Sequence, residues 1–357
     1  MSSDSVINDD TIERAGPDPL CVLSSCAVVV NDSLHVTIDT AAIERLARDL
    51  VDRNVPPPAW DEEIHYRGTG ANATEETIGW IFALDALNFC FWGQDANNPA
   101  YRWRIASGGT VHDGYMALAI ALREAARGGT PVWSPAWQAT VDNESMTRIF
   151  DPVPGSAPIP LFRARVANLR ELGRGMQSLN LGNRPFTTFV MRSGPSAPRL
   201  TRAIVGAFPS FRDVVPWKPS QAAGPALDIR LLKRAQILVS DLAGALEGTQ
   251  EVAIGERDQL TAFADYKVPQ VLRHFGILQY RDQLAATIQR RQPVAPGSRE
   301  EVEIRAATIW ACELIRQRLA GTAGRFTASD IDWMLWNLGQ SLPPACEPYH
   351  RTVTTFY

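Results

Sequence analysis

The sequence predicts a mainly α-helical fold with one small N-terminal β-hairpin. Apolar residues recur at helical spacing in several long segments, and Ser, Thr or Asp residues precede many of these segments as expected N-caps. Strand-like segments do not alternate with helices, as they would in a Rossmann or TIM fold. No repeat of fixed period occurs, so the pattern also argues against a solenoid.

The composition of the 357-residue chain is that of an ordinary globular protein. Hydrophobic residues make up 45% and charged residues 21%, and the net charge of −4 indicates no general affinity for nucleic acid or anionic membranes. The five cysteines are odd in number and no two have CxxC spacing, which predicts neither a disulfide framework nor a zinc site. We therefore expect a protein of a reducing, cytoplasmic environment.

Residues 1–17 are polar and lack the apolar core of a signal peptide, and no apolar run reaches transmembrane length. We expect these residues to form a flexible tail. Residues 18–357 have the length of one large helical domain or of two closely packed halves. The Pro-rich segment 151–158 is the expected join between two such halves.

The first elements are a hairpin and two helices. The hairpin is predicted over residues 26–38, where two apolar runs flank Asn31-Asp32. A helix over 40–53 follows. The next helix is expected to have Thr74 as its N-cap and to continue to Trp92, and it is apolar nearly all round, which predicts burial.

Asp85 interrupts this apolar helix, on a face expected to carry Phe89 and Trp92 as well. A buried charge costs several kcal/mol unless it has a partner. Two interpretations are open. The carboxylate belongs to a structural ion pair or caps a neighbouring loop, or it recognises a ligand beside an aromatic wall.

Further helices are predicted between residues 107 and 246. The expected segments are 116–127, opened by residues 107–115, then 143–150 behind Asp142, 161–172 and 227–246. Gln236 takes a buried position in the last of these, where its amide needs hydrogen-bond partners. Lys233, in the same helix, is compatible with a charge that snorkels to solvent.

The charged residues Asp265 and Lys267 stand just before Pro269, the expected first residue of a helix. A helix N-terminus favours negative charge, which suits Asp265 and does not suit Lys267. Two interpretations are open here as well. Asp265 caps the helix while Lys267 points into water, or Lys267 and the N–H groups of the first turn bind an anion such as phosphate.

Ser298 is the expected N-cap of a long helix over 299–319, in which Glu301 and Arg305 form an i,i+4 pair. Residues 329–332 have the pattern of a capping box for another helix, which makes Asp332 a structural residue.

The C-terminal segment 348–357 ends in aromatic residues and is expected to dock on the body of the protein. The metalloprotease motif HExxH, the hydrolase motif GxSxG and the kinase motifs are absent from the sequence.

Six stretches together resemble the queuosine 5′-phosphate N-glycosylase/hydrolase family, which salvages queuine. In chain order they are Asp85-Ala-Leu-Asn-Phe-Cys-Phe-Trp92, Lys233-Arg-Ala-Gln-Ile-Leu-Val239, Phe263-Ala-Asp-Tyr-Lys-Val-Pro-Gln270, Glu301-Val-Glu-Ile-Arg305, Asp332 with Leu335-Trp336, and His350-Arg351 with Tyr357. The resemblance covers about three quarters of the chain. Asn337 departs from the pattern, because an acid is expected there.

The resemblance implies a helical fold similar to that of helix-hairpin-helix DNA glycosylases. The implied reaction is hydrolysis of the bond between queuine, a base used in tRNA modification, and ribose 5-phosphate. No cofactor and no metal are implied, and the expected partner is the small-molecule substrate, without a stable nucleic-acid or membrane partner. Nothing in the sequence specifies an oligomeric state.

Cleavage of an N-glycosidic bond builds positive charge on C1′ and the ring oxygen of the sugar, so the site needs a fixed, ionised carboxylate. Asp265 is the expected catalytic residue, because a helix N-terminus and a neighbouring lysine lower the pKa of a carboxyl group. Lys233 is expected to support Asp265 or the ribose. Lys267 and the helix start are the candidates for binding the 5′-phosphate.

Queuine is a 7-deazaguanine, so it has no N7 to be protonated as the base leaves, and hydrogen bonds elsewhere must assist. Its cationic secondary amine suits the Asp85 carboxylate, and aromatic rings offer a stacking surface. The expected substrate-binding residues are Asp85, Asn88, Phe89, Trp92, Gln236, Lys267 and His350.

Two other functions are compatible with the sequence. A DNA glycosylase-like enzyme is disfavoured by the negative net charge and the lack of a basic stripe, because phosphate contacts dominate DNA binding. A non-catalytic helical module that binds the base is the second alternative.

Overall fold

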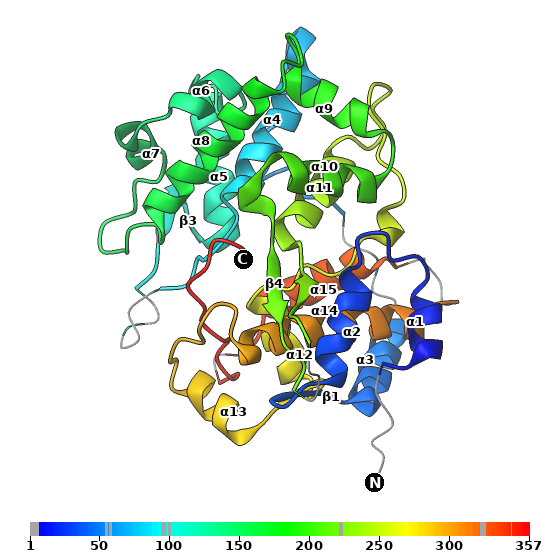
Figure 1. Cartoon of the computed structure of the whole chain (residues 1–357). Coiled ribbons are helices and arrows are strands. Elements are labelled where there is room, and N and C mark those ends of the chain that lie inside the picture. Colours follow the sequence, from blue (N-terminus) through cyan, green and yellow to red (C-terminus); the bar gives the residue numbers. More distant parts are fainter. Residues whose placement is uncertain are drawn as a thin grey trace. The chain divides into compact units, whose positions relative to one another are not determined.

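The fold is that of a computed structural model, which describes residues 7–53, 56, 59–93, 98, 101–220, 224–321, 326–343 and 345–357. The chain divides into two units that each collect distant parts of the sequence. Unit 1 comprises Met1–Pro58, Asp213–Gln236 and Glu256–Val353, and unit 2 comprises Ala59–Arg212, Ile237–Gly255 and Thr354–Tyr357. Helices dominate both units, which confirms the mainly α prediction (Figure 1).

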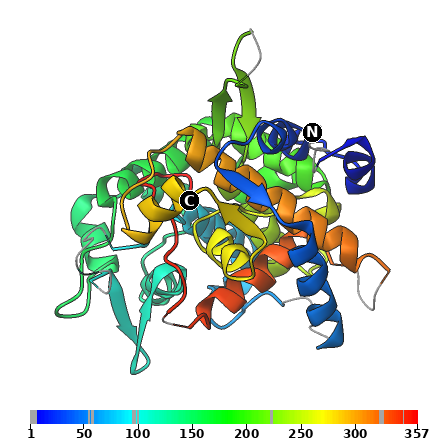
Figure 2. The same ribbon diagram turned by 90° about the horizontal axis from the view of Figure 1, so that it is seen from below.

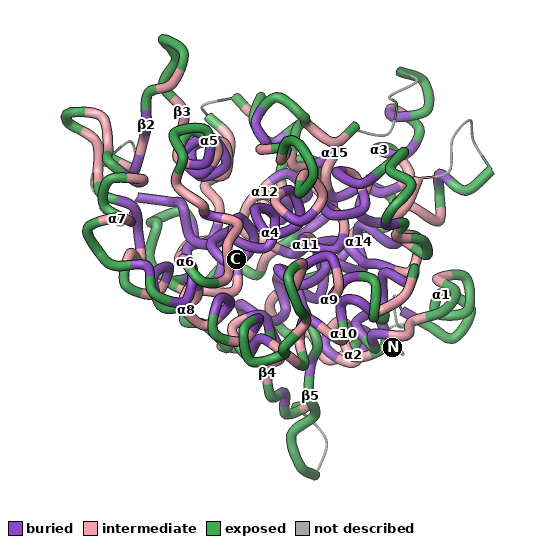
Figure 3. Tube along the Cα trace, turned by 90° about the horizontal axis from the view of Figure 1, so that it is seen from above, coloured by how far each residue is buried: buried purple, intermediate pink, exposed green. Residues whose placement is uncertain are grey.

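Unit 1 is built around one long buried helix. The described elements of this unit are α1 (Asp9–Ala15), α2 (Val22–Asn31), β1 (Val36–Ile38), α3 (Thr40–Asp52), β4 (Val214–Trp217), β5 (Leu227–Arg230), the start of α11 (Lys233–Ala245), η3 (Arg257–Gln259), α12 (Lys267–His274), β6 (Leu278–Tyr280), α13 (Asp282–Gln289), α14 (Arg299–Leu319) and α15 (Ala328–Gln340). Helix α14 contacts α2, α3, α12 and α15, and most of its residues are buried (Figure 3).

The start of α14 follows the sequence prediction. The Ser298 side chain accepts a hydrogen bond from the backbone N–H of Glu301 (3.3 Å), as an N-cap does. Deeper in the helix, the indole N–H of Trp310 donates to the backbone carbonyl of Leu23 at 3.0 Å, which joins α14 to α2. A buried indole needs such a partner, so this bond fixes how the two helices face each other.

The predicted N-terminal hairpin is wrong. Residues 22–31 form α2, and β1 pairs instead with β6, with Val36 opposite Tyr280 and Ile38 opposite Leu278 (Figure 2). A short apolar run such as residues 27–30 suits a buried helix as well as a strand, and local pattern does not distinguish the two. The turn before β1 is held by Glu303 of α14, whose carboxylate accepts from the N–H groups of Leu34 and His35.

The structure describes residues 7–17 of the segment that is predicted to be a flexible tail, and this part contains a helix. Residues 9–15 form α1, which is capped by Asn8. The side-chain amide of Asn31 donates to the carbonyl of Ile7 at 2.8 Å, and Ile7 is buried. These contacts provide the anchoring that a polar terminus needs to become ordered. Residues 1–6 of the predicted tail lie outside the described residues.

Unit 2 has the buried helix α4 at its centre. Its described elements are η1 (Gly70–Asn72), α4 (Ala73–Ala86), β2 (Arg104–Ser107), β3 (Thr110–Asp113), α5 (Gly114–Arg127), α6 (Pro135–Thr140), α7 (Asn143–Ile149), α8 (Phe162–Ser178), α9 (Pro185–Ser193), α10 (Ala197–Ala207), η2 (Pro209–Phe211) and the rest of α11. Helix α4 contacts α5, α8 and α9, and nearly every residue from Thr77 onward is buried, as predicted (Figure 3).

The ends of α4 differ from the prediction. Asn72 occupies the N-cap position in place of Thr74, and the helix ends at Ala86 rather than at Trp92. The chain after the helix is irregular, and its carbonyl groups need partners. Arg165 of α8 supplies them, because its guanidinium donates to the carbonyls of Leu87, Phe89 and Cys90.

Two hairpins precede helices that the sequence predicts. Residues 104–113 form the β2–β3 pair around Gly108-Gly109, both with positive φ. Helix α5 then runs from Gly114 to Arg127, which confirms the helix predicted over 116–127 and begins it two residues earlier. Strand β5 pairs with β4, so the helix expected from residue 227 begins only at Lys233. Glycine favours the tight turn of the first hairpin because it adopts positive φ without strain.

The C-terminal segment docks, as predicted. The N–H of Cys90 donates to the carbonyl of Tyr357 at 2.8 Å within unit 2, and Tyr357 is buried. Residues 151–158, the expected join between two halves, lie wholly within unit 2. Contacts between distant segments, rather than chain order, define the units. Whether the chain behaves as one domain or two stays a prediction.

Among the described residues, no helix has the combined length and apolar character that a membrane crossing requires.

Candidate active site

Asp265 caps the start of α12. This helix begins at Lys267, two residues before the expected first position at Pro269. The Asp265 Oδ1 atom accepts hydrogen bonds from the backbone N–H groups of Lys267 (2.7 Å) and Val268 (2.9 Å). These two hydrogen bonds confirm that Asp265 caps the helix. The two bonds fix the carboxylate in one orientation, and such fixing is also what a catalytic carboxylate needs.

Lys267 does not simply extend into water. Its Nζ atom lies 3.3 Å from Oε1 of Gln270, and its aliphatic stem runs along Gly339 of α15. A Cβ atom placed on Gly339 would lie only 2.9 Å from Cε of Lys267 and 2.9 Å from a methyl group of Val271. A larger residue at position 339 would therefore force the side chains of Lys267 and Val271 to shift, and glycine allows the close approach of α12 and α15.

The loop that carries Asp265 is held at three points by buried side chains. At Thr261, the side chain of Gln236 accepts from the backbone N–H (2.9 Å) and donates to the hydroxyl (3.0 Å). At Phe263, the backbone N–H donates to Oδ1 of Asp332 at 2.8 Å. At Ala264, the carbonyl accepts from Nε of Arg305 at 3.2 Å. Three of the four residues that precede Asp265 are thus held by hydrogen bonds to buried side chains.

Gln236 finds the partners that its buried position predicted. Its amide nitrogen also donates to the carbonyl of Leu231 at 3.2 Å, so both ends of the side chain are engaged within unit 1. These bonds leave Gln236 best suited to anchoring the loop at Thr261.

Arg305 is the centre of a buried ion network behind this loop. It is 1% exposed and makes a bidentate pair with Asp213, with distances of 2.5 and 3.1 Å. The predicted pair with Glu301 is confirmed at 3.4 Å. Asp213 also accepts from the backbone N–H of Lys233 at 3.2 Å, which links the start of α11 to the same network.

Arg305→Met is expected to destabilise the protein by about 3–5 kcal/mol, because it leaves Asp213 buried without its cation. Chemical denaturation of the purified variant measures this loss. The double variant Arg305→Met with Asp213→Leu is the control, and it is expected to recover part of the lost stability, because Glu301 is then the one carboxylate of the network left without Arg305. An unchanged unfolding midpoint in the single variant would contradict the role of this pair.

Burial decides the direction of the Asp265 pKa. The sequence predicts a lowered pKa from the helix start and the lysines, and the structure corrects this. Desolvation raises the pKa of Asp265 above its ordinary value. The charge of Lys233, the two backbone N–H groups and the charge of Lys267 oppose the rise, in that order. These groups hold the carboxylate closer to ionisation than burial alone would allow.

Lysine is a rare residue in this chain. The sequence contains three lysines, and two of them, Lys233 and Lys267, surround Asp265. Lys233 is the first residue of α11 and is only 5% exposed. Its positive charge opposes the rise that burial causes in the pKa values of both Asp265 and Asp332. The compact charge of an ammonium group can thus act on both carboxyl groups.

Asp332 is not the capping residue that the sequence predicts. The capping box is formed by Thr327 and Asp330, and the side chain of each accepts a hydrogen bond from the backbone N–H of the other. Asp332 lies two residues further along α15 than Asp330, and it is only 4% exposed. Burial, followed by the negative charge of Asp265, raises its pKa well above the ordinary value. Asp332 therefore holds a proton more readily than Asp265 does.

Asp332→Asn is expected to keep most of the activity, because the amide oxygen still accepts from Phe263 and resembles a protonated carboxyl group. A raised pKa gives stability that is lost as pH rises through the folded-state value, so the variant is expected to be at least as stable as wild type at neutral pH. Thermal unfolding across pH measures this. Asp332→Leu, which strands the Phe263 N–H, is expected to lose about 1–3 kcal/mol. Loss of stability in both variants alike would contradict a protonated Asp332.

His350 belongs to unit 1 and is buried in the C-terminal segment. Burial, and then the charge of Arg305, lower its pKa to about 3, so the imidazole is neutral. The segment is held beside it, where Thr352 donates to the carbonyl of Val294 at 3.0 Å and Arg351 forms a bridge with Pro293. His350 can therefore act as a neutral hydrogen-bonding group.

The other predicted substrate-binding residues belong to unit 2. Asp85 lies at the C-terminal end of α4 and is fully buried. The side-chain amide of Asn88 donates a hydrogen bond to its Oδ1 atom at 3.2 Å. Phe89 and Trp92 lie beyond the helix rather than on its face, and both are buried. The guanidinium of Arg165 stands over the Phe89 ring at 4.4 Å, so one face of that ring is already covered.

A buried polar cluster in unit 2 was missed by the sequence analysis. The hydroxyl of Tyr115 lies 2.7 Å from Nε2 of His65 and 3.4 Å from Oδ2 of Asp241. Burial lowers the pKa of His65 to about 4, and burial with Asp241 and Asp85 raises that of Tyr115 well above its ordinary value. These residues carry no shared sequence spacing, so only the fold reveals that they meet.

Comparison with known proteins assigns the chain to a family. The profile of a family described as "Queuosine salvage protein" matches residues 64–357. The chain is 42% identical over 340 residues to a queuosine 5′-phosphate N-glycosylase/hydrolase of Sphaerobacter thermophilus, covering 95% of this chain and 98% of that protein. Proteins of the same name from Mus musculus and Bos taurus are 32% and 30% identical, over 96% and 93% of this chain and 100% and 97% of theirs. The expected resemblance is thereby confirmed, and the chain belongs to the queuosine salvage protein family.

Proposed function

We propose that this chain hydrolyses the N-glycosidic bond of queuosine 5′-phosphate and releases queuine and ribose 5-phosphate. Family membership and the activity named for its relatives support this substrate. The observation that carries the chemistry is the Asp265 carboxylate, fixed by two backbone N–H groups and accompanied by the charge of Lys233.

Asp265 acts on the sugar. As the bond from C1′ to the base breaks, its electron pair leaves with the base, and positive charge develops on C1′ and the ring oxygen. A carboxylate in a water-poor site stabilises that charge far more than it would in bulk water. Water then adds to C1′ and gives up a proton, which Asp265 accepts as it positions the attacking oxygen. The departing base takes up one proton from solvent, and Asp265 releases to solvent the proton that it accepted. The net reaction therefore consumes one water molecule, whose hydroxyl group ends on C1′.

Lys233 keeps Asp265 ionised. A buried carboxyl group with raised pKa loses its charge unless a cation compensates, and Lys233 supplies the largest compensation. Asp332 is the group that carries the proton when the two carboxyl groups interact, because its own pKa is raised further by the charge of Asp265. The pair thus divides into one charged and one neutral member.

Lys267 is the proposed ligand of the 5′-phosphate, through its Nζ atom rather than through the helix start. The first two N–H groups of α12 already donate to Asp265, and Pro269 has none to offer. The expectation that these N–H groups share the phosphate with Lys267 therefore loses its support. Gln270, which bonds Nζ, orients it.

Recognition of the base is proposed for Asp85, Asn88, Phe89 and Trp92, with His350 as a further substrate contact.

Asp85→Asn is expected to raise KM about tenfold or more with a smaller change in kcat, because a carboxylate that binds the cationic amine of queuine contributes to binding. Steady-state kinetics measure the split. An unchanged KM together with poor folding would instead assign Asp85 to a structural ion pair.

The direct test of the proposed function is incubation of the purified chain with queuosine 5′-phosphate and detection of released queuine by mass spectrometry. We expect release that grows in proportion to enzyme concentration. Absence of the free base, with substrate bound to the protein, would favour the non-catalytic alternative.

The family resemblance also leads us to propose a fold like that of helix-hairpin-helix DNA glycosylases and a cytoplasmic location.

A further inference from the structure

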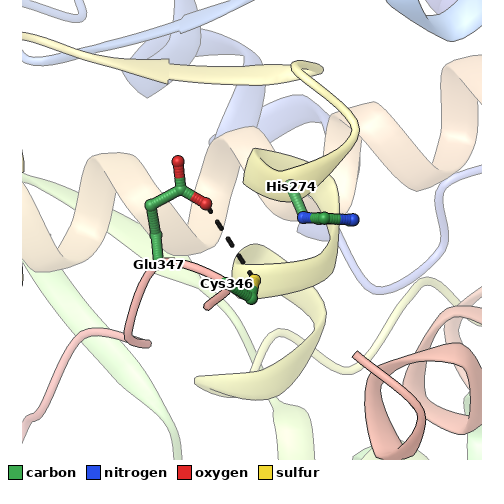
Figure 4. Close-up of side chains that lie close together, drawn as sticks. All are labelled: His274, Cys346 and Glu347. Atoms are coloured by element: carbon green, nitrogen blue, oxygen red, sulfur yellow. Dashed lines mark hydrogen bonds between the residues drawn. The ribbon is translucent and has the colours of Figure 1, made fainter. Parts of the chain in front are cut away.

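Three side chains that can bind metal come together at the end of α12, away from Asp265 at the start of that helix. They are His274 in the last turn of α12, and Cys346 and Glu347 in the segment that follows α15. One imidazole nitrogen, the Cys346 Sγ and one Glu347 carboxylate oxygen all lie within 4.8 Å of one another (Figure 4). The Sγ atom is 4.0 Å from Oε2 of Glu347. No other such group of three occurs among the described residues.

We propose that His274, Cys346 and Glu347 form a binding site for a divalent transition-metal ion of the Zn²⁺ class. Thiolate, imidazole and carboxylate are the three ligand types of protein zinc sites. Hard cations such as Mg²⁺ and Ca²⁺ prefer all-oxygen ligands and are disfavoured by the sulfur. Solvent is available for a fourth ligand position, because His274 and Glu347 are exposed.

The spacing of the ligand atoms fits a site that closes on its ion. Bonds of about 2.0–2.3 Å in tetrahedral geometry place ligand atoms roughly 3.5 Å apart. The present separations therefore need to contract by about 1 Å, which exposed side chains achieve by rotation. Cys346 loses its thiol proton to solvent as the bond from Sγ to the metal forms, and His274 and Glu347 each donate a lone pair.

The alternative of a reactive cysteine is less consistent with the structure. The Cys346 Sγ atom lies 4.0 Å from a carboxylate oxygen of Glu347, and a neighbouring negative charge disfavours the thiolate that a nucleophilic cysteine needs. A bound cation, by contrast, is favoured beside a carboxylate and supplies the charge that converts the thiol into a ligand.

The site would reinforce an existing joint between α12 and the C-terminal segment. The side-chain amide of Gln270 donates to the carbonyl of Glu347 at 2.8 Å, and the rings of Tyr266 and Tyr349 lie 4.9 Å apart. A metal ion at His274 would tie the far end of α12 to the same segment, which continues to the buried His350. Metal binding is thus expected to stabilise the folded chain.

Titration of the metal-free, full-length protein with Co²⁺ tests the proposal, since a bond from cobalt to thiolate produces a charge-transfer absorption band in the near ultraviolet. We expect one equivalent to bind with this band in wild type, the band to vanish in Cys346→Ser, and Co²⁺ affinity to fall about tenfold or more in His274→Ala and Glu347→Gln. Zn²⁺ is expected to raise the Tm of wild type and not that of Cys346→Ser.

Cys21→Ser is the matched control, because Cys21 is also an exposed free cysteine but belongs to no such cluster. It is expected to retain both the band and the Zn²⁺-dependent rise in Tm. A band that persists in Cys346→Ser, or an affinity that is the same in all three ligand variants and wild type, would overturn the proposal. Tm values without metal show that each variant is folded, and this outcome does not depend on the glycosidase activity.

Discussion

Asp265→Asn is expected to slow the release of queuine from queuosine 5′-phosphate by about 10³-fold or more, the loss typical when a group that stabilises transition-state charge is removed. The amide oxygen can still accept from the N–H groups of Lys267 and Val268, so the cap of α12 persists. What disappears is the negative charge that we propose to lie beside C1′. The effect is therefore expected in kcat, with KM changed little.

Stability should move in the other direction from activity. The raised pKa of Asp265 means that its ionisation weakens the fold as pH rises through the folded-state value, so the neutral amide is expected to unfold at the same or a higher Tm at neutral pH. Kinetics and thermal unfolding of the same preparation test both parts. Asp282→Asn, at an exposed first-turn acid of α13, is the control and should match wild type. Near-normal turnover in Asp265→Asn would refute the assignment.

Lys233→Met is expected to lower kcat/KM about 10²-fold or more at neutral pH, by removing the cation that most strongly opposes the raised pKa of Asp265. Without it, a smaller share of Asp265 is ionised at a given pH. The acidic limb of the pH–rate profile should therefore shift to higher pH, and activity should partly recover in alkaline buffer.

The pH profile distinguishes this electrostatic role from simple damage to the fold. Lys218→Met is the matched control, since Lys218 is the remaining lysine and is exposed. It should leave the profile unchanged. If Lys233→Met lowers activity equally at every pH, then Lys233 contacts substrate or supports the loop and does not act through the charge of Asp265.

Local sequence patterns predicted correctly those helices whose N-caps lie within a few residues of the helix start. Ser298 with its following acids, and Asp142 before α7, are caps that the structure confirms. The hairpin at residues 26–38 failed because β1 finds its partner in β6, far along the chain, and no local signal names that partner. The end of α4 was misplaced for a similar reason, since Arg165 of another helix satisfies the carbonyls that follow it.

The sequence predicted the charged residues of the candidate site. It did not predict the buried side chains that hold the Asp265 loop in place. Asp265 and Lys267 are conspicuous because unlike charges meet at a helix start, and the scarcity of lysine is a further signal that points to Lys233. Asp332 was mistaken for a capping residue because Ser329 and Asp332 have the spacing of a capping box, two residues after the real box of Thr327 and Asp330. The bonds of Asp332 and Arg305 to the Asp265 loop depend on tertiary packing, which spacing along the chain does not encode.

A crystal structure of the Asp265→Asn variant with uncleaved queuosine 5′-phosphate is the most direct test of the central claim. We expect a side-chain oxygen at position 265 within about 3.5 Å of C1′ or of a water molecule aligned with it, and the 5′-phosphate at Nζ of Lys267. A sugar bound with C1′ well outside that reach, and another carboxylate in its place, would contradict it.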